Sequence, residues 1–328
     1  MARPSSRATL RLGTRGGDLA SWQAREAARV IVAAHPDVAV EIMVIRTAGD
    51  RAPAAPIAEI GGTGVFTRDI EDALRSGAID LAVHSLKDLP TRVADGLALA
   101  AILERADPRD ALVAPPGSTL AGLPPGARVG TSSPRRRAQV LAQRPELVTI
   151  DVRGNVPTRL AKLDRGDFDA LVLACAGLQR LGLDARIAEV FGPEVLVPAP
   201  GQGALAVETR ADDHRVASLL QAIDHRPTRI ATQAERALLA TLEGGCHAPV
   251  GALATWADQV LTLTGVVTSL QGDRSVRGSR EMPVRTVADA EAAGVQLALS
   301  LLAQGGTEIL DEIRLRERGD RAHDRKEP

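Results

Sequence analysis

The sequence predicts an α/β protein with two βα-rich halves followed by a smaller α+β unit. Three observations support this fold class. Apolar runs that suit buried strands alternate with helical patterns through the first two thirds of the chain. The alternation stops near Arg226, where consecutive apolar strands flanked by helices take over. The chain has 328 residues, 45% of them hydrophobic and 25% charged, which suits several cores and argues against bulk disorder.

The first half predicts three strands and two helices. The expected strands are residues 8–14, 38–45 and 79–83, and the expected helices are 18–34 and 66–76. Segment 47–64 is rich in glycine and proline and has little periodicity, which predicts a mobile loop. The third strand runs directly into the polar turn 84–90, and α/β proteins place their sites at the carboxyl ends of strands.

The rest of the chain predicts a second βα-rich half and then the α+β unit. The second half has expected strands at 111–114, 128–131, 148–152 and 170–174, with helices at 134–143 and 156–165. Such repeated βα units predict parallel sheets with helices on both faces. The α+β unit has expected antiparallel strands at 250–254, 261–267 and 275–280 between helices that start at 226 and 287. The charge-rich segment after Arg314 is predicted to be disordered.

Composition excludes several classes of function. The 40 basic and 41 acidic side chains nearly cancel, so no global positive field attracts nucleic acid or an anionic membrane. Aromatic residues make up 2% and tyrosine is absent, which removes the stacking surface for single-stranded nucleic acid. No apolar run is long enough for a membrane span, and residues 1–14 lack a signal-peptide pattern, so we expect a cytoplasmic protein.

The strongest local feature is segment 130–137, Gly-Thr-Ser-Ser-Pro-Arg-Arg-Arg, at the end of an expected strand. Ser133 suits a helix cap and Pro134 the first helical position, while Arg135 and Arg136 follow at once. Free N–H groups, hydroxyls and guanidinium groups at a helix start are suited to carboxylate or phosphate. The alternative is a capped surface helix with solvated arginines.

Segment 153–159, Arg-Gly-Asn-Val-Pro-Thr-Arg, repeats this arrangement after the next strand, with Asn155 as the expected cap. Two such helix starts in succession weaken the alternative of solvated surface. Neither resembles a Walker loop, so ATP is not the preferred anion.

Two further positions lie at expected strand ends. Arg15 precedes two glycines that let a ligand approach the backbone, although such turns are common in inactive scaffolds. Lys87 and Asp88 offer a cation beside a proton acceptor in a chain whose only other lysines are at 162 and 326. An ordinary surface ion pair is the alternative.

The two cysteines differ in their surroundings, and they lack the spacing of a disulfide framework or a zinc site. Cys246 lies in a loop of glycine and proline, which suits an accessible nucleophile or attachment point, with a tolerated loop cysteine as the alternative. Cys175 lies in an apolar run and is expected to be buried and inert. His84 is expected to make an internal hydrogen bond.

Taken together, these motifs resemble the hydroxymethylbilane synthase family, also called porphobilinogen deaminases, from Leu10 to about Ile313. The matching motifs are VHSLKDLP at 83–90, VGTSSPRR at 129–136, RGNVPTR at 153–159, PAPGQG at 198–203 and LEGGC at 242–246. The resemblance implies two periplasmic-binding-protein-like α/β domains with a cleft between them, plus a smaller α+β C-terminal domain. The implied ranges are 7–103 with 204–221, then 109–197, then 226–314, with 315–328 disordered.

The resemblance also implies a chemistry. In the family the cysteine that matches Cys246 holds one dipyrromethane per chain through a thioether. The enzyme adds four porphobilinogen units to this primer with loss of ammonia and then releases hydroxymethylbilane by hydrolysis. Each ammonia loss leaves an electron-poor azafulvene, which a carboxylate stabilises. No metal, nucleic acid or membrane is implied, and a monomer is expected.

The family's site residues carry over by position. Asp88 and Lys87 match catalytic positions. The expected cofactor-binding residues are Cys246, Lys87, Thr131, Ser132, Ser133, Arg135 and Arg136, and the expected substrate-binding residues are Arg15, Arg153, Arg159 and Gln202.

Three positions depart from the commonest family pattern: Thr63 stands where lysine is frequent, Gly17 where serine is, and His247 where glutamine is usual. A lysine contact from that loop therefore does not carry over. Two other classes remain as alternatives, a non-enzymatic anion-binding protein and a protein-interaction module. A reactive cysteine with five arginines at matching positions favours the enzyme over both.

Overall fold

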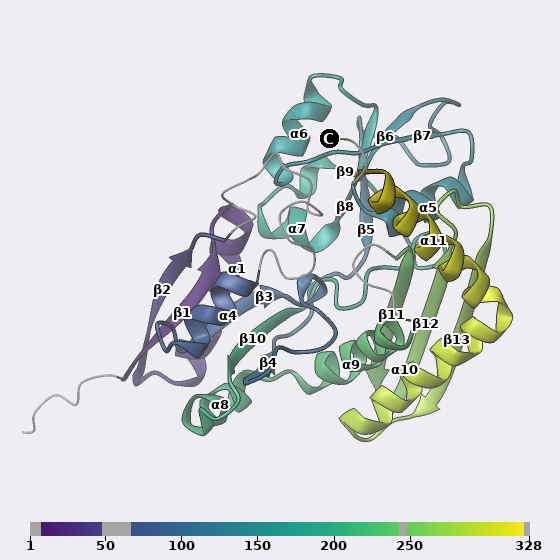
Figure 1. The fold of residues 1–328 in the computed structure, drawn as a ribbon. Coiled ribbons are helices and arrows are strands. Elements are labelled where there is room, and N and C mark those ends of the chain that lie inside the picture. The colour runs from purple at the N-terminus through teal and green to yellow at the C-terminus, as the bar shows by residue number, and fades with distance from the viewer. Residues whose placement is uncertain (1–7, 48–66, 243–247, 325–328) are drawn as a thin grey trace, which may run out of the picture. The chain divides into compact units, whose positions relative to one another are not determined.

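A computed structural model describes residues 8–47, 67–242 and 248–324 of the chain (Figure 1). It divides into two compact units, the first formed by the described parts of 1–106 and 203–229, the second by those of 107–202 and 230–328. The second unit thus contains both the second βα-rich segment and most of the C-terminal α+β segment.

Unit 1 contains a five-stranded mixed sheet. Its strands are β1 (Ala8–Arg15), β2 (Val38–Ile45), β3 (Leu81–Ser85), β4 (Leu97–Ile102) and β10 (Leu205–Arg210), in the order β2-β1-β3-β10-β4. The expected parallel pairing holds for β1 with β2 and with β3. It fails for β10, which the chain adds after leaving unit 2 and which lies antiparallel to both β3 and β4.

Helices cover both faces of this sheet. They are α1 (Asp18–Ala34), α4 (Arg68–Arg75) and α8 (His214–Leu220), with short 3₁₀ turns at Leu86–Asp88 and Gln221–Ile223. Leu10 and Leu12 of β1 share a core with α1 and α8, whereas Ala82 of β3 packs with Ile70 and Leu74 of α4. Because successive strand residues point to opposite faces of the sheet, they contribute to two separate cores.

The first sheet of unit 2 has the same layered design. Its strands are β5 (Asp110–Val113), β6 (Arg128–Gly130), β7 (Val148–Ile150), β8 (Ala170–Ala174) and β9 (Ile187–Val190), in the order β7-β6-β8-β5-β9. Here β6 is parallel to β7 and β8, while β5 is antiparallel to β8 and β9. Both sheets are thus mixed rather than parallel throughout.

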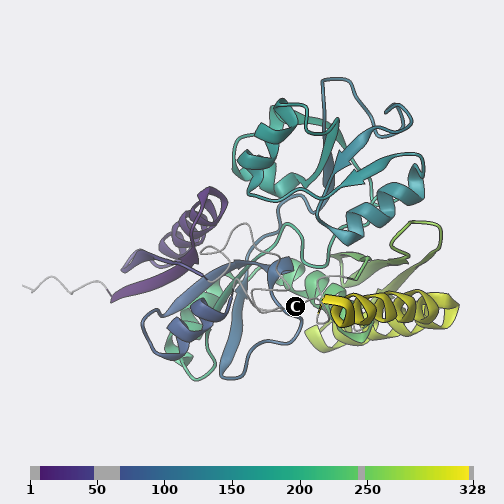
Figure 2. The ribbon, with the colours of Figure 1, turned by 45° about the horizontal axis from the view of Figure 1, so that its top comes forward.

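Alternate strand residues of this sheet also pack on opposite faces. Leu112 and Val172 lie in one core with α5 (Pro134–Gln143), whereas Val113 and Leu171 lie in another with α6 (Val156–Asp164) and α7 (Cys175–Arg180). Figure 2 shows helices on both sides of these strands.

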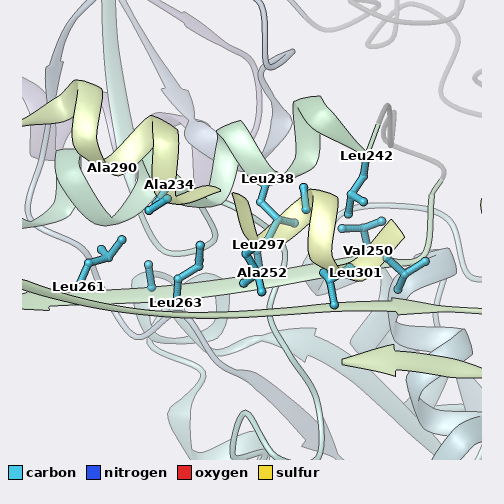
Figure 3. Close-up of a cluster of buried hydrophobic side chains, with 14 of the residues drawn as sticks. Ala234, Leu238, Leu242, Val250, Ala252, Leu261, Leu263, Ala290, Leu297 and Leu301 are labelled. Atoms are coloured by element: carbon cyan, nitrogen blue, oxygen red, sulfur yellow. The ribbon is translucent and has the colours of Figure 1, made fainter. Parts of the chain in front are cut away.

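The C-terminal part of unit 2 is the expected α+β segment. Its elements are α9 (Arg226–Thr241), β11 (Val250–Ala257), β12 (Val260–Thr268), β13 (Ser275–Pro283), α10 (Val287–Leu301) and α11 (Thr307–Asp324). The three strands form an antiparallel sheet in chain order, as predicted. In Figure 3, leucines of α9 and α10 point toward Leu261 and Leu263 of β12, and these side chains form one buried core.

The turn between β12 and β13 touches helix α5 backbone to backbone. Gly272 in this turn has φ +76, and a Cβ built there lies 2.4 Å from Ala142 N and 2.6 Å from Ala138 O. Only glycine permits both the left-handed conformation and this approach. Arg277 of β13 adds hydrogen bonds to the carbonyls of Pro193 and Glu194 at 2.9 and 3.1 Å. The antiparallel sheet is therefore fixed to the segment that carries α5.

The C-terminal segment differs from its prediction. Helix α11 continues to Asp324, so residues 315–324 are helical rather than disordered. Just before this segment, Arg314 pairs with Asp311 at 2.9 Å on the same helix. Within the described ranges, we find no helix that combines the length and apolar character needed to cross a bilayer.

Candidate functional site

The two predicted helix starts lie side by side in unit 2. Strands β6 and β7 are parallel neighbours, and each leads at its carboxyl end into a helix, α5 or α6. Both predicted caps are confirmed: Ser133 Oγ accepts a hydrogen bond from Arg136 N, and Asn155 Oδ1 accepts one from Thr158 N at 2.9 Å. Proline stands in the first turn of each helix, where no intrahelical N–H bond is lost.

Arg135 and Arg136 are buried and converge on one carboxylate. Arg135 Nη1 donates to Asp110 Oδ2 at 2.7 Å, and Arg136 Nε donates to Asp110 Oδ1 at 2.9 Å. Burial alone raises the pKa of Asp110, but the two guanidinium groups reverse this effect and hold that pKa well below its usual range. Burial also lowers the pKa of Arg135, and the charge of Asp110 opposes that shift. The pair is therefore held inside the unit rather than solvated at its surface.

The hydroxyl groups of the same loop are also ordered by local contacts. Thr131 Oγ1 accepts a hydrogen bond from Ser133 N at 3.2 Å. Ser132 Oγ donates to the carbonyl of Val152, which connects the loop after β6 to the segment after β7. Both sequence-predicted segments thus belong to one edge of the sheet.

Gln202 is another predicted residue of this unit, and it too contacts Asp110. Its Nε2 donates to Asp110 Oδ1 at 2.9 Å and to the carbonyl of Pro108 at 2.7 Å. Only 1% of the residue is exposed. Gln202 therefore belongs to the arginine–aspartate cluster formed by Asp110, Arg135, Arg136 and Gln202.

Arg153 and Arg159, at the start of α6, are more accessible. Arg153 is exposed and pairs with Asp151 at 3.4 Å, while the half-buried Arg159 donates from Nε to the Gly154 carbonyl at 2.8 Å. Burial lowers the pKa of Arg159, and the positive charge of Arg136 acts in the same direction. The two helix starts therefore repel each other electrostatically, an arrangement that an anion relieves.

In unit 1, the predicted residues lie at the ends of two parallel strands. Arg15 ends β1, and Lys87 and Asp88 form the turn after β3, the strand that pairs with β1. Asp88 is exposed, whereas Arg15 and Lys87 are half-buried. Arg15 and Asp88 thus share one edge of the first sheet.

Buried polar contacts hold the turn that carries Asp88. His84 Nε2 lies 3.1 Å from Glu208 Oε2 of β10, which confirms the expected internal hydrogen bond of His84. Gln23 of α1 donates to Ser85 Oγ at 2.8 Å, and Leu86 N donates to the Ala204 carbonyl at 3.0 Å. The turn is fixed from three sides, with Asp88 at its exposed end.

Cys246 and His247, like Thr63 and the rest of the predicted loop, lie outside the described residues. Helix α9, which precedes the cysteine segment, is anchored by Glu235. The two oxygens of Glu235 accept hydrogen bonds from Gly201 N and Ala254 N, each at 2.7 Å. Cys175 is buried, as predicted, and burial raises the pKa of its thiol to about 12.

Sequence reasoning missed three buried acids: Asp110, Glu208 and Glu235. Each is at most 2% exposed and contacts residues distant in sequence. Asp110 and Glu208 did carry a signal, because each is a charged residue in or next to an apolar strand run, where an unpaired acid is costly.

These features define an α/β protein with two arginine-bearing helix starts at the edge of one sheet and a lysine–aspartate turn at a strand end of the other. Comparison with known proteins is specific. Residues 10–218 match the model "Porphobilinogen deaminase, dipyromethane cofactor binding domain", and residues 230–303 match "Porphobilinogen deaminase, C-terminal domain". The chain therefore belongs to the porphobilinogen deaminase family, the dipyrromethane-containing enzymes of tetrapyrrole biosynthesis.

Individual relatives agree over nearly the whole chain. The porphobilinogen deaminase of Moorella thermoacetica is 49% identical over 93% of this chain and 96% of its own. That of a Roseiflexus species is 51% identical over 92% of this chain and 98% of its own. Among solved structures, the methionine-binding protein MetQ aligns with a TM-score of 0.42 at 15% identity, over 66% of this chain and 89% of that one.

Proposed function

We propose that Arg135, Arg136, Arg153 and Arg159 bind the carboxylates of the dipyrromethane and of the growing pyrrole chain. Each pyrrole carries an acetate and a propionate, so the chain is a polycarboxylate. Guanidinium groups match carboxylates in shape as well as in charge. The observation that carries the proposal is the pairing of two arginine-bearing helix starts at the ends of neighbouring parallel strands.

The dipyrromethane fits the donor set of this edge. Thr131, Ser132 and Ser133 supply hydroxyls beside the guanidinium groups, and Lys87 and Arg15 supply cations at the edge of the other sheet. When bound, the cofactor supplies the primer to which four porphobilinogen units are added. Arg15 and Gln202 complete the proposed substrate-binding set.

Asp88 is the proposed catalytic carboxylate, with Lys87 beside it. An exposed carboxylate at a strand end accepts hydrogen bonds from pyrrole N–H groups and favours the positive charge that develops as ammonia leaves. The hydrogen-bonded turn beneath it holds the backbone of Asp88 in place. Lys87 contributes a cation for a substrate carboxylate.

Asp88→Asn tests this role, because the amide keeps the shape and removes the charge. Turnover of porphobilinogen should fall by about 10² to 10⁴, with an unchanged melting temperature. Near-normal turnover by a folded variant would reduce Asp88 to a surface residue. An Asp95→Asn variant serves as the control, since Asp95 is an exposed acid of the same unit that pairs with Arg92 at 3.3 Å.

Cys246 is the proposed covalent anchor. Intact-mass measurement should show a dipyrromethane adduct on the wild type and on Cys175→Ser, and none on Cys246→Ser. Peptide mapping of the adduct to Cys175, or active protein without any adduct, would exclude this anchor.

We further infer a cytoplasmic monomer whose substrate is porphobilinogen alone, without a nucleic-acid or membrane partner. The net charge of −1 supports this, because it gives no field to attract a large polyanion. Light scattering after gel filtration should give the mass of one chain, 34.4 kDa plus the cofactor. A mass of two chains would contradict the monomer.

A further inference from the structure

The arginine–aspartate cluster joins three segments of unit 2 through one carboxylate. Asp110 opens strand β5, the two arginines lie in the first turn of helix α5, and Gln202 lies in the segment between β9 and β10. The side chain of Asp110 has no exposure, and both its oxygens accept hydrogen bonds from these partners. Such a carboxylate contacts only protein groups.

Stability alone does not explain why charged residues occupy these positions. A buried ion cluster is often no more stable than apolar residues of the same volume. In addition, Arg135 and Arg136 stand in the first turn of α5, where the helix dipole disfavours cations, and no acidic residue occupies that turn. The arrangement places positive charge where an approaching anion benefits most.

Asp110 fixes the planes of both guanidinium groups. Arg136 reaches Asp110 Oδ1 through Nε at 2.9 Å and through Nη2 at 2.8 Å, and its Nη1 donates to the Val172 carbonyl at 3.2 Å. Arg135 Nη1 bridges Asp110 Oδ2 and the Val197 carbonyl at 2.7 and 2.8 Å. Two positive charges face one negative charge, so the cluster keeps an excess positive charge while both arginines are held in one geometry.

We propose that Asp110 is a positioning residue, which holds Arg135 and Arg136 in the geometry that receives the carboxylates of the dipyrromethane. The inference rests on the proposed role of the arginine pair as carboxylate ligands. It adds that the pair works only while a buried partner, itself out of contact with the ligand, fixes it. A mere neutralising role would have the opposite effect, since removing Asp110 would then strengthen anion binding.

The test compares Asp110→Asn with the wild type in purified full-length protein. The measured quantities are the fraction of chains that carry the adduct by intact mass, kcat/KM for porphobilinogen, and the melting temperature. We expect loading and kcat/KM to fall by about 10- to 100-fold, the usual cost of misplacing binding groups. A folded Asp110→Asn protein that loads as well as the wild type, or better, overturns the proposal.

Asp107→Asn is the matched control. Asp107 lies three residues earlier in the chain and pairs with Arg109 at 2.7 Å rather than with the arginine pair. We expect normal loading from this variant. A loss equal to that of Asp110→Asn would show a general sensitivity of the segment and would overturn the specific role of Asp110.

A second variant decides the matter if Asp110→Asn fails to fold. Gln202→Met keeps its volume and every charge of the cluster, and removes the donor to Asp110 Oδ1. Gln202 is 1% exposed and bonds Asp110, and its proposed direct role is toward substrate rather than the dipyrromethane, so we attribute a change in dipyrromethane loading to the cluster. Reduced loading by folded Gln202→Met supports the proposal, and wild-type loading overturns it.

A double-variant cycle separates positioning from a general loss of structure. If Asp110 acts through Arg136, Asp110→Asn adds little further loss in an Arg136→Leu background, whereas a general structural loss adds in full. The same variants distinguish a failure of the proposed ligand-binding role of the arginine pair from a failure of the positioning role of Asp110. Normal loading by Arg136→Leu and Arg135→Leu would remove the proposed role of the arginine pair. Lost loading by these variants with normal loading by Asp110→Asn would remove only the role of Asp110.

Discussion

The starts of helices α5 and α6 use the same sequence device with different outcomes. Each follows a short strand of one sheet, has a side-chain cap and a proline in its first turn, and has arginines in or just before that turn. At α5, Arg135 and Arg136 are buried against Asp110, whereas at α6 Arg153 is exposed and Arg159 is half-buried.

The difference lies in the partner and not in the local pattern. At α5, strand β5 supplies the fully buried carboxylate of Asp110, and the guanidinium groups of Arg135 and Arg136 are buried because they pair with it. At α6, the nearest acid of Arg153 is Asp151, itself exposed at the end of the preceding strand. We therefore expect the α5 arginines to serve both the fold and the ligand, and the α6 arginines to serve the ligand alone.

The largest expected effect is on folding at the α5 start. Arg136→Leu leaves Asp110 with less compensation in the interior, and breaking a buried pair in this way costs about 3–5 kcal/mol. Chemical denaturation of the purified variant measures this loss. A cost below about 1 kcal/mol, the range of surface ion pairs, would remove the distinction between the two starts.

A smaller effect is expected at the turn that supports α5. Gly272→Ala places a Cβ against the backbone of α5 and strains a left-handed residue, which together should cost about 1–3 kcal/mol. Loading should weaken as well, because α5 carries the arginine pair. Gly117→Ala is a suitable control, since Gly117 has φ +82 but nothing within 4 Å of its Cβ position. It should show the backbone strain without the displacement of α5.

Acid should weaken the α5 start through Asp110. The pKa of Asp110 is lowered in the folded protein, so its contribution to stability is complete above the unfolded value of about 3.9 and is lost as the pH falls below it. The slope from this one group is at most about 1.4 kcal/mol per pH unit. Unfolding free energies of the wild type below pH 4 should therefore fall more steeply than those of Asp110→Asn. Equal slopes would contradict the buried ionised state of Asp110.

The smallest effect on stability is expected at the α6 start. Arg153→Leu removes an exposed side chain and should change the unfolding free energy by less than about 0.5 kcal/mol. The rate at which porphobilinogen units are added, monitored by intact mass, should nevertheless fall. A variant that is as destabilised as Arg136→Leu would show that the two starts are equivalent after all.

The sequence predicted the positions of these elements better than their environments. Caps and strand periodicity are local, so the starts of α5 and α6 at Pro134 and Val156 followed from Ser133 and Asn155. The burial of Arg135 and Arg136 did not follow, because it depends on Asp110, which is 25 residues away from Arg135. The antiparallel insertion of β10 was equally inaccessible, since its partners precede it by more than a hundred residues.

In the candidate site, too, local features could be predicted from the sequence, whereas contacts between distant residues could not. The strand ends at Arg15 and Lys87 and the buried state of Cys175 could be predicted from neighbours in the chain. The support beneath Asp88 could not, because Glu208 reaches His84 from a strand added after the whole second sheet. Non-local contacts of this kind have no signature in a short window of sequence.

The burial of Cys175 allows a thiol titration to measure cofactor attachment at the other cysteine, Cys246. The sequence contains only two cysteines, and a thiol whose pKa is about 12 is almost wholly protonated at neutral pH and unreactive toward alkylating reagents. We therefore expect any rapid alkylation of the native protein to report on Cys246 rather than on Cys175. The proposed thioether at Cys246 would block that reaction, so a titration with a coloured thiol reagent should count the molecules without cofactor in a preparation.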